Sequence, residues 1–178
     1  MRLWLDCRAS PIGEILMAWD AEARLRVLDF REFEPRMRTL LRLHYGAVEL
    51  MHSPAPAFLA EPIDRYFSGE MAAVDVIEVA TGGTEFQKSV WTALRGIKPG
   101  ERLSYGDLAR RLGRQKAVRA VGGANGANPI SVVVPCHRVI GAGGALTGYG
   151  GGLHRKVWLL NHEARYTHSG KTDLFAGQ

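Results

Sequence analysis

The most apolar stretch of the chain is interrupted in its middle by polar residues. Residues 130–140 are Ile-Ser-Val-Val-Val-Pro-Cys-His-Arg-Val-Ile. The β-branched run at 130–134 predicts a short buried strand or an extended apolar segment. Pro135 cannot donate a hydrogen bond to a neighbouring strand, so regular pairing should end there. The Cys-His-Arg sequence at 136–138 would therefore follow directly from a rigid element.

A cysteine beside a base and a cation can be a nucleophile, because both favour the thiolate. Most free cysteines are instead small buried hydrophobes, and the local sequence leaves both interpretations open for Cys136. Neighbouring residues on an extended segment point to opposite sides, so His137 would act on Cys136 through a bound water. Glu163 is the one acid of the last predicted helix, and it could complete a Cys-His-Glu relay.

Alternating apolar and polar positions predict three antiparallel strands near the start of the chain, at 2–7, 14–19 and 25–30. A helix is expected at 34–44, and a second helix should end at Gly69. The expected apolar face of that second helix comprises Phe58, Leu59, Ile63, Tyr66 and Phe67. One more strand is expected around 74–77. Residues 1–80 thus predict a small α/β domain with no chemistry of its own.

A glycine-containing linker at 81–83 leads into a second domain, expected at 81–165. Helices are predicted to start at Thr84, at Ser104 and near Gln115. Ser104 and Asp107 have the form of a capping box, and Gly113 separates two short helices. Two short helices joined by a glycine turn and surrounded by arginines are typical of a helix-turn-helix.

The second of these helices, at 117–125, is rich in alanine and glycine. Each of its two glycines weakens it by roughly 1 kcal/mol relative to alanine. Its small face would let the backbone lie in a narrow groove of DNA, with Arg119 as the one long side chain reaching in. The alternative is an internal helix that packs closely on a neighbour.

The loop at 141–152 is rich in glycine but lacks the Lys-Ser/Thr ending of a P-loop, which excludes a nucleotide triphosphate site. Its permissive backbone suits a pocket wall whose amides face a flat ligand. A last helix is expected at 153–163, followed by a polar, frayed tail at 166–178. Its inward residues should be Leu153, Val157 and Leu160, and its outward residues Arg155 and Lys156.

Charge is divided unevenly along the chain. Residues 1–80 hold 9 basic and 13 acidic residues, a net of −4, whereas residues 81–178 hold 14 basic and 5 acidic residues, a net of +9. A basic half of this kind suits a polyanionic partner, although basic surfaces are often merely solvated. The hydrophobic content of 46% and charged content of 23% are those of a soluble globular protein.

The sequence contains no apolar run of the roughly 18 residues that a membrane span needs, and no signal peptide is expected. The two cysteines, Cys7 and Cys136, form no disulfide framework, so we expect a cytoplasmic protein with a free thiol. Cys7, His44 and His52 lack the spacing of metal ligands, and no metal site is expected.

Several motifs resemble those of the O6-alkylguanine-DNA alkyltransferases, also called methylated-DNA–protein-cysteine methyltransferases. The matching stretches are Pro135 to Val139, Arg119 to Ala124, Asn128-Pro129, Ser104-Tyr105, Gly148-Tyr149 and His162-Glu163. The resemblance is specific over about 81–165 and only general before that. It implies an α/β (α+β) fold, with a small RNase H-like α/β domain at 1–80 and a mostly helical, winged helix-turn-helix-like domain at 81–165.

The resemblance also implies roles for catalytic residues. Cys136 would take the alkyl group from O6 of guanine or O4 of thymine in duplex DNA, after the base is flipped out of the stack. His137 would act through water as the base, and Glu163 would orient it. Tyr105 would donate a proton or hydrogen bond to the departing purine.

Further residues would bind DNA or the flipped base. Arg119 would enter the stack from the minor groove and hold the place of the flipped base, and Asn128 would link this helix to the active-site segment. The DNA-contacting set implied by the resemblance is Arg119, Ala120, Gly122, Gly123, Ala124, Asn128 and Arg138. Backbone groups of Val139, Tyr149 and Gly150 would line the base pocket.

The implied partner is double-stranded DNA with alkylated bases, bound without a cofactor by a monomer that can cluster on DNA. The thioether product cannot be removed, so one turnover per molecule is expected. Gly150 stands where some relatives carry serine, which removes one side-chain contact to O6 and leaves the adduct preference open. Some relatives also carry zinc in the N-terminal domain, but this sequence lacks that ligand set.

Three rival functions remain at this point. A cysteine hydrolase would use Cys136 and His137 but would need no basic helix-turn-helix. A helix-turn-helix regulator would need a helix with base-reading side chains, and residues 117–125 are too small for that. A lesion-binding protein without transfer would have no use for Cys136.

Overall fold

The computed structural model describes residues 1–167. The chain divides into two compact units, which are described separately. Unit 1 comprises residues 1–84 together with 129–133, and unit 2 comprises residues 85–128 and the chain from residue 134 onward. The sequence suggested one boundary near residue 81 and gave no sign that a later segment returns to the first unit. Unit 1 mixes strands and helices and unit 2 is mostly helical, in keeping with the predicted α/β class.

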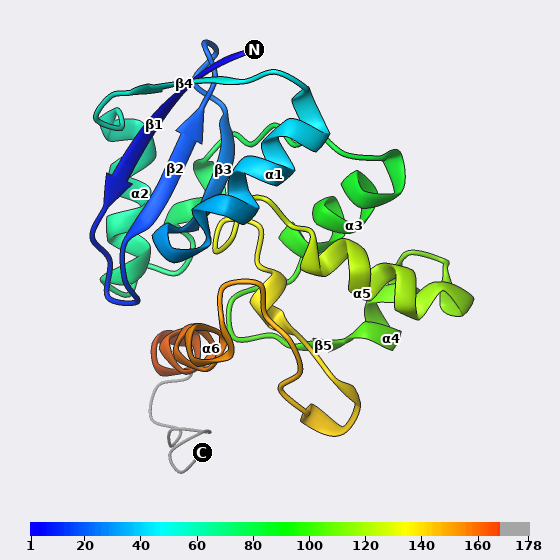
Figure 1. The fold of residues 1–178 in the computed structure, drawn as a ribbon. Coiled ribbons are helices and arrows are strands. Elements are labelled where there is room, and N and C mark those ends of the chain that lie inside the picture. The colour runs from blue at the N-terminus through cyan, green and yellow to red at the C-terminus, as the bar shows by residue number, and fades with distance from the viewer. Residues whose placement is uncertain (168–178) are drawn as a thin grey trace. The chain divides into compact units, whose positions relative to one another are not determined.

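Unit 1 is built on a four-stranded sheet of order β3-β2-β1-β4 (Figure 1). Its strands are β1 (Arg2–Arg8), β2 (Ile15–Trp19), β3 (Leu25–Phe30) and β4 (Glu49–His52). β1, β2 and β3 pair antiparallel, which confirms the predicted meander, and β4 pairs parallel with β1. The sequence did not predict β4, because its four residues are mostly exposed and show no alternation.

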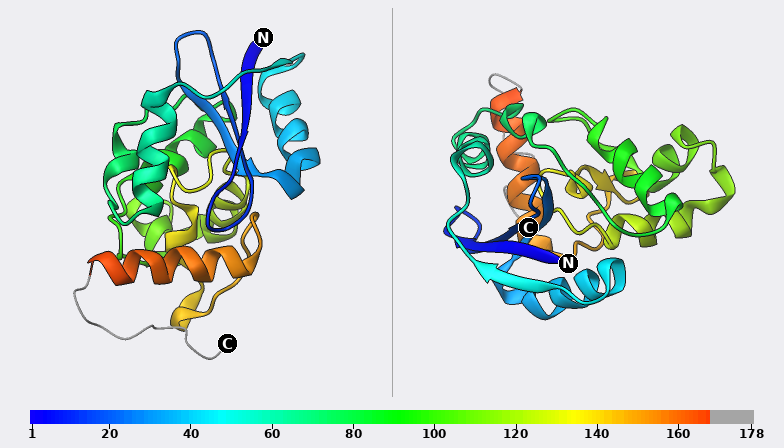
Figure 2. Two further views of the ribbon diagram at one scale, coloured as in Figure 1. Left: turned by 90° about the vertical axis from the view of Figure 1, so that its left-hand side faces the viewer. Right: turned by 90° about the horizontal axis from the view of Figure 1, so that it is seen from above.

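Two helices cover this sheet, α1 (Glu34–Tyr45) and α2 (Ala57–Phe67). α1 packs Met37 and Leu41 against a buried cluster from β1, β2 and β3. Figure 2 shows α2 on the opposite side of the strands from α1. The sheet therefore has a hydrophobic layer on each face.

Two expectations for unit 1 were wrong. Phe58 was assigned to the inner face of α2, but it is exposed. The buried residues of this helix are Leu59, Ala60, Pro62, Ile63 and Tyr66. The segment around 74–77 was expected to be a strand, but Ala73–Val76 is a short 3-10 helix. Val74 is buried and Val76 exposed, whereas residues two apart on a strand would share a face.

Residues 129–133 meet β3 through two backbone hydrogen bonds. The amide of Leu28 donates to the Pro129 carbonyl at 3.1 Å, and the amide of Ser131 donates to the Leu28 carbonyl at 2.8 Å. These bonds tie the segment just before the Cys-His-Arg sequence to the sheet of unit 1.

The strand predicted at 130–134 is wrong. Only Ile130 forms a β-bridge, and Val132 has a φ of 71°, a left-handed conformation that is uncommon for a β-branched residue. The amide of Val133 donates to the carbonyl of Ser131 at 2.8 Å, which closes a γ-turn around Val132. The valine run is buried as expected, but in a tight turn rather than an extended ladder.

Unit 2 contains four helices and one short pair of strands within the described residues. They are α3 (Glu85–Arg95), β5 (Leu103–Ser104), α4 (Tyr105–Arg111), α5 (Val118–Gly126), β6 (Val139–Ile140) and α6 (Leu153–Thr167), with 3-10 turns at Gln115–Ala117, Cys136–Arg138 and Ala142–Gly144. β5 and β6 pair in parallel. α4 and α5 form the expected helix pair, and Gly113 between them takes a φ of 66°, which glycine adopts without strain.

The start of α4 is fixed by side-chain bonds. Ser104 Oγ accepts from the Asp107 amide at 3.0 Å, and the Asp107 carboxylate accepts from the Ser104 amide at 3.2 Å, so the predicted capping box is confirmed. α5 packs on α3, where Trp91 Nε1 donates to the Ala124 carbonyl at 2.9 Å. These contacts hold both helices of the pair in fixed positions within unit 2.

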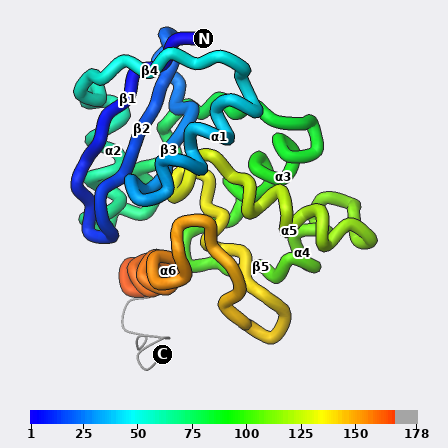
Figure 3. The backbone as a smooth tube through the Cα atoms, viewed as in Figure 1, coloured from blue at the N-terminus to red at the C-terminus, as the bar shows by residue number. Residues whose placement is uncertain are grey.

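The loop at 141–152 leads into α6, as the orange part of the trace shows (Figure 3). α6 presents a different face from the one expected: Leu153 is exposed, whereas Arg155 and Lys156 are buried. The spacing was misleading because the two cations are buried with backbone carbonyls as hydrogen-bond acceptors. The tail expected at 166–178 begins within this helix, and positions 168–178 lie outside the described residues.

Candidate active site

Cys136 is the first residue of a 3-10 turn and is only 5% exposed. Its amide donates to the Val134 carbonyl at 2.8 Å, and Pro135 between them has φ −81° and ψ 64°, the geometry of an inverse γ-turn. Two tight turns in succession thus set the direction of the cysteine. The extended backbone expected at 136–138 is wrong, because the proline turn starts a helical turn there.

Two asparagines hold the cysteine. Asn128 Nδ2 donates to Cys136 Sγ at 3.1 Å and to the Val134 carbonyl at 2.8 Å. Asn125 Nδ2 lies 3.5 Å from the Cys136 carbonyl oxygen. A donor at sulfur favours the thiolate over the thiol. Asn128 is buried and bonds to the candidate nucleophile, so the expectation that it contacts DNA is corrected.

His137 and Glu163 form a buried pair. His137 Nε2 lies 2.7 Å from Glu163 Oε1, and both side chains are fully buried. Burial lowers the pKa of His137, against the opposing attraction of Glu163. His137 Nδ1 has no hydrogen-bond partner among residues 1–167. With Nε2 donating to the carboxylate, Nδ1 carries the lone pair that can accept a proton.

Glu163 is held by more than the histidine. Arg138 donates to it from Nε at 3.0 and 3.1 Å and from Nη2 at 2.8 Å, and the Gly100 amide donates at 3.2 Å. Burial favours the neutral acid, but His137 and Arg138 outweigh it and hold the pKa of Glu163 well below its usual range. The carboxylate is therefore ionised at neutral pH.

Arg138 does not have the position expected of a DNA contact. It is buried, pairs with Glu163, and also donates from Nη1 to the Ile97 carbonyl. A guanidinium with these partners is not available to a phosphate. The expectation that Arg138 contacts DNA is therefore wrong. Arg138 and His137 are neighbours in sequence, and both side chains bond to the carboxylate of Glu163.

Tyr105 is the half-buried first residue of α4. Burial raises the pKa of its phenol, as does the nearby charge of Cys136, while hydrogen bonds to Thr147 and Asn125 act in the opposite direction. The phenol is thus protonated at neutral pH and can donate. A Cβ at Gly122 would lie 3.6 Å from the Tyr105 ring, so a small residue there lets α5 approach α4 closely.

α5 turns a small, basic face to solvent. Arg119, Ala120 and Gly123 are exposed, and a Cβ at Gly123 would meet nothing within 4 Å. Ala124 was expected on the same face but is buried, with its carbonyl bonded to Trp91. The sequence left open whether this helix packs inside the protein or faces a DNA groove. In the structure one face packs closely within unit 2 and the other face is exposed.

The residues expected to line a base pocket lie at both ends of the glycine-rich loop. Val139 is fully buried in β6, and Tyr149 and Gly150 are half-buried where the loop nears α6. Lys156, which sequence reasoning placed outside, donates to the Val139 carbonyl at 2.6 Å. The sequence could not indicate this contact, because every residue has a backbone carbonyl and the pattern of apolar positions does not show which one a lysine will reach.

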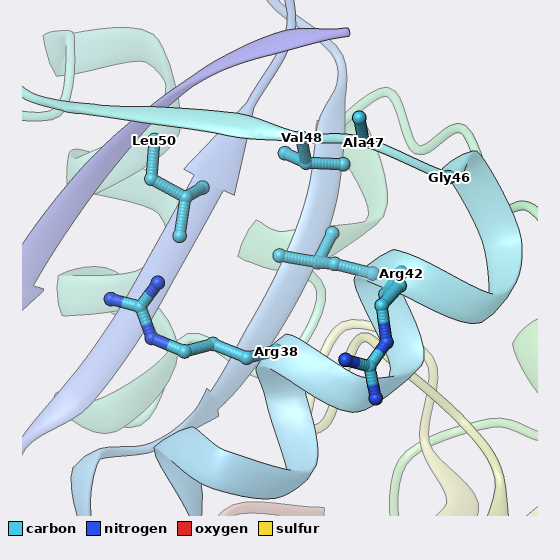
Figure 4. A pocket seen from close by; sticks show the side chains of 7 residues that line it. Arg38, Arg42, Gly46, Ala47, Val48 and Leu50 are labelled. Carbon is cyan, nitrogen blue, oxygen red and sulfur yellow. The ribbon is translucent and has the colours of Figure 1, made fainter.

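Other candidate features do not add to this site. Within the described part of the chain, no cluster of three or more Cys, His, Asp or Glu could bind a metal ion. No helix among the same residues could span a bilayer. A pocket on unit 1 is lined by Arg38, Leu41 and Arg42 of α1, by residues 46–48 and by Leu50 of β4 (Figure 4). It contains none of the expected site residues.

Comparison with known proteins gives consistent matches. A family model described as "6-O-methylguanine DNA methyltransferase, DNA binding domain" matches residues 85–165. A methylated-DNA–protein-cysteine methyltransferase of Salmonella typhimurium is 49% identical over 165 residues, which is 92% of this chain and 96% of that protein. One from Mycolicibacterium paratuberculosis is 54% identical over 160 residues, covering 89% and 90%.

Solved structures agree in fold. The Mycobacterium tuberculosis O6-methylguanine methyltransferase has a TM-score of 0.77 at 38% identity, covering 94% of this chain and 96% of that one. A structure of Mycobacterium tuberculosis OGT in complex with DNA has a TM-score of 0.77 at 36% identity, covering 98% of each chain. The chain therefore belongs to the O6-alkylguanine-DNA alkyltransferases, the methylated-DNA–protein-cysteine methyltransferases, which repair DNA by moving an alkyl group to a cysteine.

Proposed function

We propose that Cys136 is the acceptor in this chain and takes an alkyl group from O6 of guanine, or O4 of thymine, in duplex DNA. The observation that carries this proposal is the buried His137–Glu163 pair at 2.7 Å, one residue from a cysteine whose sulfur accepts a bond from Asn128. This is the arrangement of base, orienting carboxylate and nucleophile that activates a thiol.

The first step is deprotonation of the thiol. A water between Cys136 Sγ and His137 Nδ1 would carry the thiol proton to the ring, which is neutral because burial lowers its pKa. Glu163 keeps Nε2 protonated and so keeps the lone pair on Nδ1. The Asn128 amide then stabilises the thiolate.

The second step is displacement at the alkyl carbon. The thiolate forms an S–C bond as the bond from that carbon to O6 breaks, and the electron pair of this bond stays on the purine. The protonated phenol of Tyr105 donates a proton or hydrogen bond to the purine and so neutralises the developing charge. The thioether formed on Cys136 is a stable bond that would not return to the thiol, so each molecule reacts once.

The base must leave the stack to reach a cysteine that is only 5% exposed. The exposed face of α5 suits this step, because Ala120 and Gly123 let the backbone approach a minor groove while Arg119 enters the stack. Minor-groove binding carries little sequence information, which suits a protein that searches all DNA for damage.

The state of the protein in the cell forms part of the proposal. A cytoplasmic monomer that can cluster on alkylated DNA would suffice, because every group used above belongs to one copy of the chain. Gly150 offers no side chain to O6, so adducts larger than methyl are reasonable substrates to include in any test.

The direct experiment is intact-mass analysis after mixing the protein with duplex DNA that contains O6-methylguanine. We expect the wild type to gain one methyl group and Cys136→Ser to gain none. Tight lesion binding without any mass gain would make the protein a recognition protein. The absence of both lesion binding and mass gain would favour a cysteine hydrolase. Removal of more than one methyl group per protein molecule would contradict the single turnover.

A further inference from the structure

Arg155 and Lys156 occupy an unfavourable place in the fold. They are the third and fourth residues of α6, where a positive charge faces the positive end of the helix dipole. Both are buried, and Lys156 has no exposed surface. Burial lowers the pKa of Lys156, which reflects the cost of removing an ammonium group from water. Such a placement needs compensating contacts.

The compensation for Lys156 comes from three carbonyl groups and, within residues 1–167, from no carboxylate. Its Nζ donates to the Val139 carbonyl at 2.6 Å, and to the carbonyls of Thr147 and Gly148 at 3.3 Å each. An ammonium group has three N–H donors, so these carbonyls use its full capacity. Arg155 Nη1 adds a bond to the Gly151 carbonyl at 2.7 Å.

These carbonyls lie on both limbs of one loop. Val139 comes before the loop at 141–152, whereas Thr147, Gly148 and Gly151 belong to its returning limb. One lysine side chain thus joins the two limbs, and the arginine beside it holds the last part of the returning limb.

The loop's own backbone bonds fix its tip and its end: the Gly141 amide donates to the Ala145 carbonyl at 2.7 Å, and the Gly152 amide donates to the Tyr149 carbonyl at 2.9 Å. The stretch between them, which includes Thr147 and Gly148, is where the lysine bonds. Residues 142–145 are exposed, and Gly143, Gly144 and Gly148 have φ values of 69°, 85° and 53°, a region that suits glycine. A glycine-rich segment loses much conformational entropy when it is ordered. Strong bonds from a cation to the carbonyls on both limbs can offset that loss.

The geometry points to Arg155 and Lys156 as positioning residues that hold the two limbs of the loop together as the wall of the base pocket. This inference rests on the proposed function. Bonds to the Thr147 and Gly148 carbonyls fix the peptide planes that lead into Tyr149, whose backbone meets the flipped base in the proposal. Thr147 also bonds to Tyr105, so the returning limb is tied to the residue that assists the departing purine.

The test separates pocket shape from thiol chemistry. Lys156→Met keeps the length of the side chain and removes the ammonium, and Lys88→Met is the matched control on a partly exposed lysine of α3. Three quantities are measured: the single-turnover rate on a saturating O6-methylguanine duplex, the affinity for undamaged duplex, and the rate of Cys136 alkylation by iodoacetamide. The last is measured at about pH 9, above the usual thiol pKa of about 8.5, which reduces the influence of the lysine charge on ionisation.

We expect Lys156→Met to slow transfer by about tenfold or more, which corresponds to the loss of one hydrogen bond from a charged group. The charge of Lys156 also acts on Cys136 and His137, which is why alkylation is measured at about pH 9. At that pH, DNA affinity and iodoacetamide alkylation should change by less than about twofold if the lysine acts through the loop. Arg155→Met should have a smaller effect in the same direction, and Lys88→Met should have none.

Two outcomes would overturn the inference. Transfer at the wild-type rate would show that the loop needs no cation, and equal losses in transfer and iodoacetamide alkylation would place Lys156 in the support of the thiol or the fold. If Lys156→Met does not fold, as judged by its melting temperature, Lys156→Gln replaces it, since an amide can still reach two carbonyls and should give an intermediate rate. A wild type that transfers nothing would refute the proposed function itself, which is a separate result.

Discussion

Glu163 Oε1 lies 2.7 Å from His137 Nε2, and the same carboxylate accepts hydrogen bonds from Arg138 and from the Gly100 amide. Because three partners stabilise its charge, the carboxylate stays ionised, while burial keeps the histidine neutral. The pair is thus set so that the ring can accept a proton at neutral pH.

Replacing Glu163→Gln should slow alkyl transfer by roughly 10²-fold or more, because the ring loses the group that fixes its tautomer. The variant should also melt at a lower temperature, since the buried Arg138 loses its counter-charge. Single-turnover rates and thermal unfolding measure the two effects. Glu70→Gln is the control, because its pair with Arg65 is exposed and should matter little. Equal rates for both variants would contradict the relay.

Stability should fall as the solution is acidified. The pKa of His137 is lowered from its ordinary value of 6.5, so below about pH 6.5 the unfolded state takes up a proton that the folded state does not. The free energy of unfolding should then decrease by at most about 1.4 kcal/mol per pH unit for this group. Glu163, whose pKa is also lowered, adds a further loss below its ordinary value of 4.5.

Urea unfolding at several pH values between 7.5 and 5 tests this expectation. Burial also lowers the pKa of His44, which acts in the same direction. His137→Gln separates the two, because its stability should depend less steeply on pH than that of the wild type. Identical slopes for the two proteins would mean that His137 does not titrate as proposed.

Replacing Asn128→Ala should make the thiol harder to ionise, because Cys136 Sγ loses a donor at 3.1 Å. A hydrogen bond to a charged group is worth about 1.5–3 kcal/mol, which corresponds to roughly one to two pH units. The midpoint of iodoacetamide alkylation against pH should move upward by that amount. Asn128→Asp places a carboxylate at the same point and should move it further. An unchanged midpoint in both variants would exclude Asn128 from thiol activation.

Arg119 and Arg138 should behave in opposite ways. Arg119→Ala should weaken transfer from duplex DNA while leaving the melting temperature close to that of the wild type, because the side chain is exposed. Arg138→Ala should lower the melting temperature strongly, because breaking a buried ion pair reduces the free energy of unfolding by roughly 3–5 kcal/mol. Transfer and thermal unfolding measured on both variants decide between the two roles. A stable Arg138→Ala protein with weakened DNA binding would restore the original assignment.

The parts of the fold that the sequence predicted correctly are those with local signals. The capping box at Ser104 and the alternation in β1 to β3 depend on neighbouring residues, so a single sequence contains the information. The valine run before Pro135 was misjudged, because its turn depends on contacts with Leu28, about a hundred residues earlier. No periodicity encodes such a contact.

The site shows the same division. Cys136, His137 and Glu163 were identified from residue type and from the resemblance, and the histidine–glutamate contact is present as expected. The burial of Arg138 and Lys156 could not be predicted. Charged residues are rarely buried unless they are paired, so without knowledge of their partners they are expected at the surface. Both side chains donate hydrogen bonds to backbone carbonyls, and the residue type at a position does not show whether its carbonyl will accept such a bond.

The short return of residues 129–133 to unit 1 has a consequence for dissecting the molecule. The segment matched by the family model, 85–165, includes these residues but not Leu28, which donates to Pro129 and accepts from Ser131. A truncated protein cut at residue 85 would leave those backbone groups without their partner, a few residues before Cys136. A cut at the family boundary therefore separates residues 129–133 from the strand of unit 1 to which they bond, and a shortened protein that is meant to keep this segment in place must also keep β3.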